Sequence, residues 1–272
     1  MPPSHSQNAV APHSNNGTPT IGNPSQLIVL VPIYRPHLDA LEQFSLDTSL
    51  SSLAGRDIRF IGPNGLELAL YTERYPSIPF IGFEDASFAS IEGYNRLLLN
   101  PEFYKRFAEF EFVLILQTDA IVLRDELDFW CGQPFDYVGA PWPDSVELFV
   151  NLGRFEGDKG RRLRAMVGNG GLSLRRIRKC IPLLQEFPEA IDFFNRSGSS
   201  EDLFFFFMGL LSCDFVMPNE ITASLFSLEL KPSYYMAVNG GKIPMGGHAW
   251  WKYEPEFWRK LLVNAPLPEV QD

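Results

Sequence analysis

The sequence predicts an α/β fold in which helices flank a mostly parallel β-sheet. Short runs rich in Val, Ile and Leu alternate with helix-like segments from residue 26 to about residue 135. The runs are apolar almost throughout, which is typical of strands that are buried on both faces, and parallel strands need helical crossovers such as those between them. After residue 135 the alternation fades, so we expect an irregular second half.

The first two pairs of strand and helix show the pattern clearly. LIVLVPIY at 27–34 is an unbroken apolar run and predicts a buried strand. The segment at 36–55 predicts a helix, because it has a proline in its first turn and a glycine at its end. DIRFIG at 57–62 predicts the second strand, and GLELALYTERY at 65–75 predicts the second helix.

The alternation continues to a fourth strand. IPFIGF at 78–83 predicts a strand, SIEGYNRLLLN at 90–100 a helix, and PEFYKRFAEF at 101–110 a further helical segment. FVLILQ at 112–117 then predicts a strand. Ligands of such sheets bind beyond the carboxyl ends of the strands, so the residues that follow each strand are the first candidates for function.

The second half is expected to combine short strands, helices and loops. The segments that suggest this are YVGAPW at 137–142, a polar connection at 143–166 that could include a mobile loop, VGNGGLSLRR at 167–176, SSEDLFFFFMGLL at 199–211 and GGHAWWKY at 246–253.

The chain is expected to form one domain behind a disordered tail. Residues 1–25 are rich in Pro, Ser, Asn and Gly and fit no signal peptide. Residues 26–272 form the predicted domain, with a regular half at 26–135 and an irregular half at 136–265.

Composition excludes several functions. A net charge of -10, from 23 basic and 33 acidic residues, argues against a nucleic-acid binder. No apolar run approaches the roughly 20 residues that a membrane-spanning helix needs. Cys131, Cys180 and Cys213 are odd in number and lack metal-ligand spacing, so we expect reduced, mostly buried thiols and a cytoplasmic protein.

An acid interrupts the apolar run LILQTDAIVLRD at the end of the fourth predicted strand. Gln117, Thr118 and Asp119 follow that strand, as Tyr34 and Arg35 follow the first. The parallel sheet places both groups at its ligand-binding edge. A single acid there could also cap a turn, so Asp119 alone leaves both interpretations open.

Five motifs in this order resemble the GT-A type of nucleotide-sugar glycosyltransferase, which has a Rossmann-like sheet. They are VPIY after the first strand, Q-T-D after the fourth, then G-N-G-G-x-S-L-R, an E-D pair that opens a helix, and a late G-H-A-W. The set is most similar to an uncharacterised microbial domain family grouped with these enzymes, and it spans about residues 27–260. The resemblance implies transfer of a sugar from a nucleoside diphosphate donor to a hydroxyl acceptor, such as a glycan. It also implies that 26–135 is the nucleotide-binding half of the domain and 136–265 the donor-sugar and acceptor half.

The resemblance also implies a divalent cation, Mn²⁺ or Mg²⁺. GT-A enzymes usually carry Asp-x-Asp here, and the second acid binds the cation that bridges the donor's two phosphates. Asp119 keeps that second acid, whereas Gln117 replaces the first. His248 is expected as a further metal ligand, and imidazole suits Mn²⁺ better than Mg²⁺. A histidine that merely packs in a glycine-flanked turn is the alternative.

Glu201 and Asp202 open a predicted helix and resemble the acidic pair in which inverting GT-A enzymes place their catalytic base. Asp202 is slightly preferred as the base that takes a proton from the acceptor hydroxyl. Acids at a helix N-terminus are also favourable without any catalytic role. The resemblance further implies donor contacts from Pro32, Tyr34, Asn95, Gln117, Asp119, Gly170 and Gly171, with Tyr34 stacking near the nucleobase.

Other basic and aromatic residues have two interpretations each. The arginines and lysine of two dense basic patches could lie on solvated faces or contact phosphate, and three tryptophans could stack on sugars or pack in the core. These residues are Arg161, Arg162, Arg164, Arg175, Arg176, Arg178, Lys179, Trp142, Trp250 and Trp251.

Two other functions compete with sugar transfer. One is a non-catalytic protein that binds a nucleotide sugar or carbohydrate, which the missing first acid makes plausible. The other is a nucleotidyltransferase. It usually needs a glycine-rich basic loop after the first strand, where this chain has YRPHLD.

Overall fold

The computed structural model describes residues 25–150 and 161–262. The tail expected at 1–25 therefore lies outside the described residues except for its last position. The middle of the connection at 143–166 lies outside them as well.

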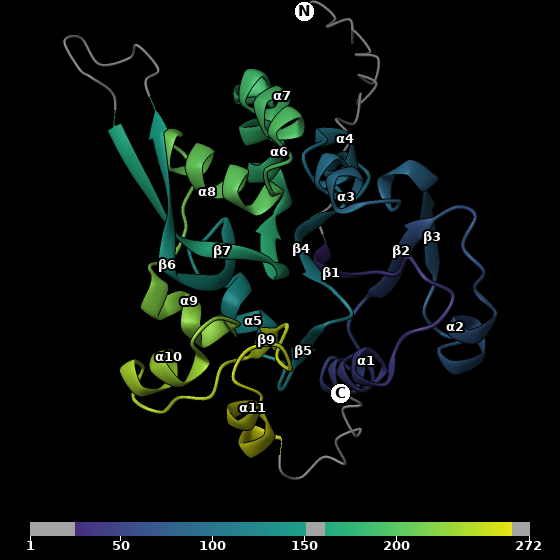
Figure 1. The fold of residues 1–272 in the computed structure, drawn as a ribbon. Coiled ribbons are helices and arrows are strands. Elements are labelled where there is room, and N and C mark those ends of the chain that lie inside the picture. The colour runs from purple at the N-terminus through teal and green to yellow at the C-terminus, as the bar shows by residue number, and fades with distance from the viewer. Residues whose placement is uncertain (1–24, 151–160, 263–272) are drawn as a thin grey trace, which may run out of the picture.

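Six strands form the central sheet in the order β3-β2-β1-β4-β7-β6 (Figure 1). β3, β2, β1 and β4 are mutually parallel, whereas β7 runs antiparallel to β4 and β6 antiparallel to β7. The predicted α/β class with a mainly parallel sheet is thus confirmed. The strands are β1 (Ser25–Pro32), β2 (Ile58–Pro63), β3 (Phe80–Phe83), β4 (Phe110–Leu116), β6 (Tyr137–Val150) and β7 (Arg161–Arg176).

The apolar strands bury both of their faces, as their composition predicts. Successive side chains of a strand point to opposite faces. In β1, Ile28 and Leu30 accordingly join the hydrophobic core on one side of the sheet, and Val29 and Val31 join the core on the other. The residues of β4 divide in the same way.

Helices cover both cores. On one side lie α3 (Ile91–Leu98), α4 (Pro101–Lys105), α6 (Ile177–Glu186), α7 (Pro188–Ser197) and α8 (Glu201–Leu211). On the other side lie α1 (Ala40–Ser52), α5 (Leu127–Cys131) and α9 (Glu220–Phe226). The remaining helices are α2 (Ala69–Arg74), the 3₁₀ turn η1 (Asp85–Ser87), α10 (Pro232–Val238) and α11 (Pro255–Leu261). No helix in the described part of the chain is long and apolar enough to cross a membrane.

The first helix begins later than the sequence predicts. Pro36 does not lie in its first turn, because α1 starts at Ala40. Asp39 caps the helix by accepting hydrogen bonds from the backbone N–H groups of Leu41 and Glu42, and the Glu42 side chain accepts one from the Asp39 N–H. This capping box sets the start of the helix more strongly than a nearby proline does.

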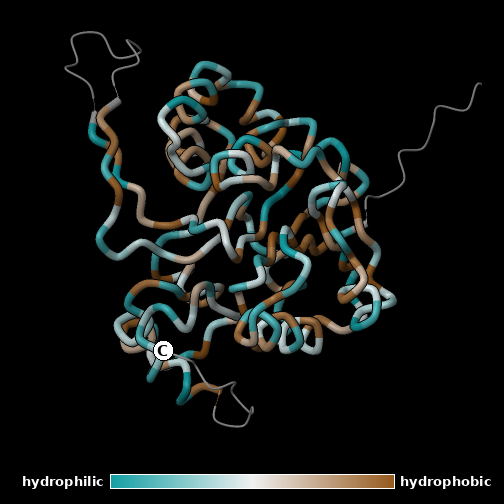
Figure 2. The backbone as a smooth tube through the Cα atoms, turned by 45° about the vertical axis from the view of Figure 1, so that its right-hand side comes forward, coloured by the Kyte–Doolittle hydropathy of each residue, from teal (hydrophilic) through white to brown (hydrophobic). Residues whose placement is uncertain are grey.

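The segments at 137–142 and 167–176, for which the sequence predicts short strands, helices and loops, are parts of two long strands in the central sheet. β6 has 14 residues and β7 has 16. Their pairing is irregular between Val138 and Val146, and a Cβ on Gly139 would lie closer than 3.0 Å to the Asn169 carbonyl oxygen. The glycines therefore allow a bulged antiparallel pair. The described ends of the connection at 143–166 extend this pair into an arm that projects from the molecule (Figure 2).

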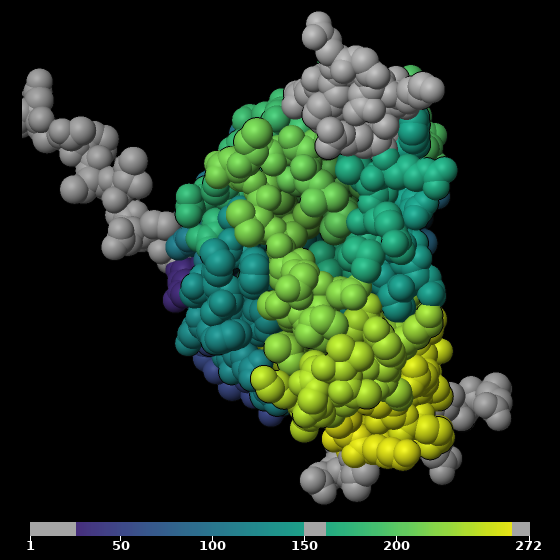
Figure 3. Space-filling view, turned by 90° about the vertical axis from the view of Figure 1, so that its left-hand side faces the viewer, coloured from purple at the N-terminus to yellow at the C-terminus, as the bar shows by residue number. Residues whose placement is uncertain are grey.

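A second sheet of three strands lies at the carboxyl end of β4. Its order is β5-β9-β8, with β5 (Ala120–Val122), β9 (Gly246–His248) and β8 (Ser227–Leu228). β5 pairs antiparallel with β9, and Ala120 lies opposite His248. This small sheet brings the late part of the chain, which Figure 3 shows in yellow beside the green helices, back to the turn after β4.

Candidate active site

The Q-T-D segment forms a tight turn between the two sheets. β4 ends at Leu116, and β5 begins at Ala120. The Ala120 N–H donates to the Gln117 carbonyl at 2.9 Å, and the Gln117 N–H donates to the Gly171 carbonyl of β7 at 2.9 Å. The turn is thus attached to the central sheet, and Asp119 lies at its tip.

Asp119 and His248 meet although 129 positions separate them in the sequence. Asp119 Oδ1 lies 3.1 Å from His248 Nε2, and Asp119 Oδ2 accepts a hydrogen bond from Lys252 Nζ at 3.0 Å. The Ala249 N–H donates to the Asp119 carbonyl at 2.9 Å, which aligns the end of β9 with the turn. The two residues predicted to bind metal are therefore in contact in the structure.

Two charged residues extend this contact, and the sequence analysis does not identify either. Lys252 follows β9 and is half exposed, whereas Glu229 follows β8 and is buried. Glu229 Oε2 lies 3.3 Å from His248 Nδ1. Glu229, His248, Asp119 and Lys252 thus form a row in which acidic and basic groups alternate. Only the pairing of β8 with β9 brings Glu229 there, and that pairing is not visible in local sequence.

Asp119 and His248 shift each other's pKa toward the ionised form. Burial alone would raise the pKa of Asp119, but hydrogen bonds and charges from His248 and Lys252 hold that pKa well below its usual value. Burial alone would lower the pKa of His248, but Asp119 and Glu229 raise it to about 9. At neutral pH His248 is therefore an imidazolium that faces Asp119 on one side and Glu229 on the other.

The glycines of G-N-G-G make room for these side chains. A Cβ on Gly171 would lie closer than 3.0 Å to the His248 ring, and a Cβ on Gly170 would lie 2.8 Å from Glu201 Oε1. Gly247 likewise accommodates the Trp258 ring. Gly170 and Gly171 thus pack closely against the Glu201 and His248 side chains, and neither glycine lines the neighbouring cavity.

A cavity of about 620 Å³ opens beside Asp119. Of the residues predicted from sequence, Pro32, Tyr34, Asn95, Gln117, Asp119 and Glu201 line it, and Trp251 does so as well. Asp202 and His248 are not part of the lining. Charged lining residues that the sequence analysis does not select as site residues are Arg35, Asp39, Glu42 and Lys252.

Tyr34 stands exposed at the cavity, with 51% of its surface accessible. The Arg35 guanidinium lies 5.2 Å from the centre of the Tyr34 ring and pairs with the buried Glu42 carboxylate. Thr118 donates a hydrogen bond to Glu42 Oε1 at 3.0 Å, so helix α1 is linked to the Q-T-D turn. The exposed ring is free to stack on a planar ligand.

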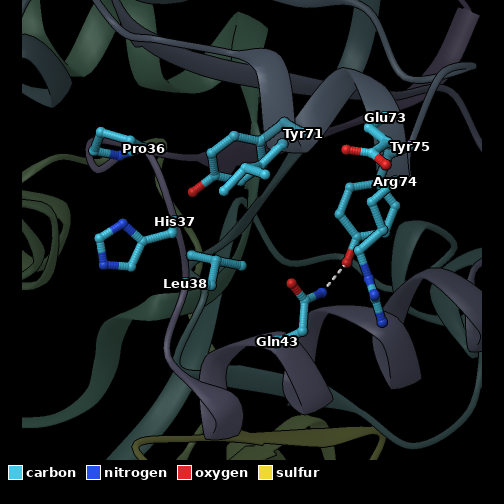
Figure 4. A pocket seen from close by; sticks show the side chains of 9 residues that line it. Pro36, His37, Leu38, Gln43, Tyr71, Glu73, Arg74 and Tyr75 are labelled. Carbon is cyan, nitrogen blue, oxygen red and sulfur yellow. Dashed lines mark hydrogen bonds between the residues drawn. The ribbon is translucent and has the colours of Figure 1, made fainter.

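A second cavity of about 500 Å³ lies between the segment that follows Tyr34 in the sequence, helix α1 and helix α2 (Figure 4). Pro36, His37 and Leu38 line it together with α2, and Gln43 is hydrogen-bonded to the Tyr75 hydroxyl. None of the predicted site residues lines this cavity.

Glu201 is held in a buried ion pair. Arg175 Nη2 donates to Glu201 Oε1 at 2.6 Å, and both side chains are almost fully buried. The Arg175 guanidinium lies 4.9 Å from the centre of the Tyr137 ring and 5.2 Å from that of Phe205. Neither interpretation of the basic patch, as a solvated face or a phosphate contact, is therefore correct for Arg175.

Arg176 is buried too, and it pairs with Glu111 and Asp136. Of the three tryptophans, Trp250 is buried in the core and Trp142 packs against Phe206. Only Trp251 reaches the cavity.

Asp202 differs from its neighbour in both contacts and pKa. Its carboxylate accepts hydrogen bonds from the backbone N–H groups of Gly170 at 3.2 Å and Leu203 at 2.7 Å, and from the Ser200 hydroxyl. Burial and the nearby charge of Glu201 raise the pKa of Asp202 to about 7, although these hydrogen bonds oppose the shift. A carboxyl group of this pKa can exchange a proton near neutral pH.

The fold has counterparts among solved structures. The chain has the GT-A glycosyltransferase fold, and solved structures share it. The galactosyltransferase LgtC, in complex with donor and acceptor sugar analogs, is similar to the chain at a TM-score of 0.51 and 18% identity, over 90% of this chain and 98% of that one. An active-site mutant of LgtC matches at 0.51 and 16% identity, over 89% and 98%. The bifunctional glycosyltransferase WbbM matches at 0.51 and 11% identity, over 92% of this chain and 51% of its own length.

The chain belongs to the family described as "Protein of unknown function (DUF5672)", whose model matches residues 77–248. The matched region contains Asp119, the acidic pair at 201–202 and His248. No curated protein matches the sequence.

Proposed function

We propose that the chain transfers a sugar from a nucleoside diphosphate donor to a hydroxyl acceptor, with a divalent cation at Asp119 and His248. The observation that carries the proposal is the contact of these two side chains, 3.1 Å apart, at the edge of the 620 Å³ cavity. The glycosyltransferase fold supports it, because GT-A neighbours include an enzyme whose complex holds donor and acceptor sugar analogs.

The two side chains fit a cation such as Mn²⁺ or Mg²⁺. Two ligands about 2.1 Å from an octahedral cation, at right angles to each other, lie about 3.0 Å apart. Asp119 Oδ1 and His248 Nε2 have nearly that spacing at 3.1 Å. Among residues 25–150 and 161–262 no group of three or more His, Cys, Asp or Glu is arranged to hold a metal, so the remaining ligands would be donor phosphates and water.

The other cavity residues would bind and orient the donor. Tyr34 offers its exposed ring to the nucleobase, and Gln117 and Asn95 offer amide groups to the ribose and sugar hydroxyls. Lys252, which is half exposed beside Asp119, would contact the diphosphate. A bound cation would stabilise the negative charge that builds on the diphosphate as the sugar leaves.

The acidic pair would serve the acceptor. The base takes the proton of the acceptor hydroxyl, the acceptor oxygen bonds to the anomeric carbon, and the bond from that carbon to the nucleoside diphosphate breaks. The pKa of Asp202, raised by burial to about 7, supports it as this base, whereas Glu201 has the better position because it lines the cavity. Direct attack of this kind inverts the anomeric configuration.

A transfer assay tests the proposal. The wild type is incubated with nucleotide sugars and a panel of hydroxyl acceptors in the presence of Mn²⁺, and the anomeric configuration of any product is determined by NMR. We expect Asp119→Ala to lose at least about 100-fold in rate. Asp192→Asn is the control, since Asp192 is exposed on α7.

Each outcome decides one part of the proposal. Full activity of Asp119→Ala would remove the cation site from the mechanism. A product with retained configuration would remove the role of Asp202 or Glu201 as a base. Binding of nucleotide sugar without transfer or hydrolysis across the panel would favour a non-catalytic binding protein.

A further inference from the structure

Glu229 lies beside His248 for a structural reason. β8 and β9 are parallel, and Leu228 is paired with Gly247. Glu229 directly follows β8, and His248 is the last residue of β9. Because each comes one position after the pair Leu228 and Gly247, the two lie side by side. Glu229 is only 8% exposed and does not line the cavity, so it can act on a ligand there only through another residue.

The contact between the two side chains engages the nitrogen that does not face Asp119. Glu229 Oε2 lies 3.3 Å from His248 Nδ1, at the long end of hydrogen-bond distances. Within the described ranges 25–150 and 161–262 both atoms are buried and neither makes a hydrogen bond of full geometry, so each is the nearest polar group available to the other. Gly171 lies against the same ring, so the imidazole is held between the backbone of β7 and a buried carboxylate.

A carboxylate at Nδ1 decides what Nε2 can do. A neutral imidazole carries its proton on one nitrogen only, and a carboxylate acceptor keeps that proton on the nitrogen it faces. With the proton on Nδ1, the Nε2 lone pair points toward Asp119 Oδ1, 3.1 Å away. Two lone pairs at this distance repel each other unless a proton or a metal cation lies between them.

From this arrangement we infer that Glu229 is a positioning residue, which fixes the Nδ1–H tautomer and the ring orientation of His248 so that Nε2 can bind a divalent cation with Asp119. The inference rests on the cation site of the proposed function. Carboxylates that orient metal-binding histidines in this way typically contribute 10- to 100-fold to metal affinity.

Binding of Mn²⁺ tests the inference without any enzyme assay. Free Mn²⁺ is measured by EPR during titration of the full chain with MnCl₂, first alone and then with saturating UDP or GDP. We expect Glu229→Leu to weaken Mn²⁺ binding about 10- to 100-fold. We expect Glu229→Gln, which keeps a hydrogen-bond acceptor, to weaken it less. Glu189→Gln is the control for an exposed glutamate on α7 and leaves Mn²⁺ binding unchanged.

A double-variant comparison separates positioning from general support of the fold. In a His248→Ala background, Glu229→Gln is expected to have no further effect on Mn²⁺ binding, because Glu229 acts through the imidazole. The side-chain ¹H–¹⁵N NMR spectrum gives a second readout, since the chain has only 4 histidines. The neutral His248 ring of the wild type is expected as the Nδ1–H tautomer, and that of Glu229→Leu with a larger Nε2–H population.

The outcomes distinguish this inference from the proposed function. Absence of Mn²⁺ binding by the wild type, alone and with either nucleotide, overturns the cation site and the positioning role together. Wild-type binding that Glu229→Leu and Glu229→Gln both retain in full overturns the positioning role alone. An effect of Glu229→Gln that persists undiminished without His248 overturns it as well. If Glu229→Leu does not fold, the Gln variant and the NMR spectrum decide.

Discussion

Both carboxylate oxygens of Asp119 contact a basic side chain from the late part of the chain. Oδ1 faces His248 and Oδ2 faces Lys252. Both neighbours are cationic, so they balance the charge of this single acid. Gln117 attaches the turn to Gly171 through its backbone N–H. The amide side chain at position 117 therefore adds no negative charge to the site, while its backbone fixes the geometry of the turn.

Gly171 provides a prediction at the residue scale. A methyl group there would lie closer than 3.0 Å to the His248 ring, so Gly171→Ala is expected to displace the imidazole from Asp119. Mn²⁺ binding, measured by EPR, should weaken at least about 10-fold, since a metal ligand must hold its position closely. Gly132→Ala is the control, because the nearest atoms to its added methyl group lie at 3.4 Å. Equal Mn²⁺ affinity of wild type and Gly171→Ala would show that the ring is not held from this side.

The helices and strands divide into those that local sequence predicts and those that it does not. β1 to β4 were predictable because each is a short apolar run whose alternate residues enter two cores. For β6 and β7 the sequence predicts no more than short strands among helices and loops, because their length and their place in the central sheet depend on pairing with each other and with β4. The reciprocal hydrogen bonds of Asp39 and Glu42 set the start of α1, whereas Pro36 suggested an earlier start from the sequence.

The same division applies to the site. Asp119 could be selected because it follows a recognisable strand, and the resemblance to GT-A enzymes adds His248 through its G-H-A-W motif. Glu229 could not, since its role depends on the parallel pairing of two short strands. The burial of Arg175 could not be predicted either, because a charged residue next to other arginines suggests an exposed patch. Its partners Glu201, Tyr104 and Ser173 come together only in the folded chain.

The N-terminus of α8 provides a prediction about pH. The folded-state pKa of Asp202 is raised from 3.8 to about 7, first by burial and then by the charge of Glu201. Between these pH values the folded chain retains a proton that the unfolded chain has lost, so the contribution of Asp202 to stability falls as pH rises. The slope is at most about 1.4 kcal/mol per pH unit for one group.

Chemical denaturation of wild type and Asp202→Asn between pH 4 and pH 8 measures this effect. The free energy of unfolding of the wild type, relative to the variant, is expected to decline from pH 4 to about pH 7 and then to level off. The variant also loses carboxylate hydrogen bonds, which shifts the difference equally at every pH. Asp192→Asn serves as the exposed control on α7. A difference that does not change with pH would show that Asp202 is ionised throughout the range.

At the scale of the whole molecule, the cavity joins segments that lie far apart in the sequence. Tyr34 follows β1, Asn95 belongs to α3, Asp119 follows β4, and Lys252 follows β9. A ligand that contacts all of them links the parallel part of the central sheet to the small second sheet. Such a ligand binds only the folded chain and must therefore raise the free energy of unfolding.

This linkage predicts how the melting temperature responds to ligands. At a concentration about 100 times its Kd, a ligand adds about 2.7 kcal/mol to the free energy of unfolding. For a chain of this size that corresponds to a rise of about 5 to 10 °C in Tm.

Because the cation would contact both the protein and the diphosphate, Mn²⁺ should increase the shift in Tm caused by a nucleoside diphosphate but not the shift caused by the corresponding nucleoside. Asp119→Ala should remove the Mn²⁺-dependent part of the shift, since one of the two protein ligands is lost, and should leave most of the shift that stacking on Tyr34 provides. A thermal-shift screen of nucleosides, nucleoside diphosphates and nucleotide sugars, with and without Mn²⁺, measures both parts, and no stabilisation by any of these ligands would exclude a nucleotide-binding function for the cavity.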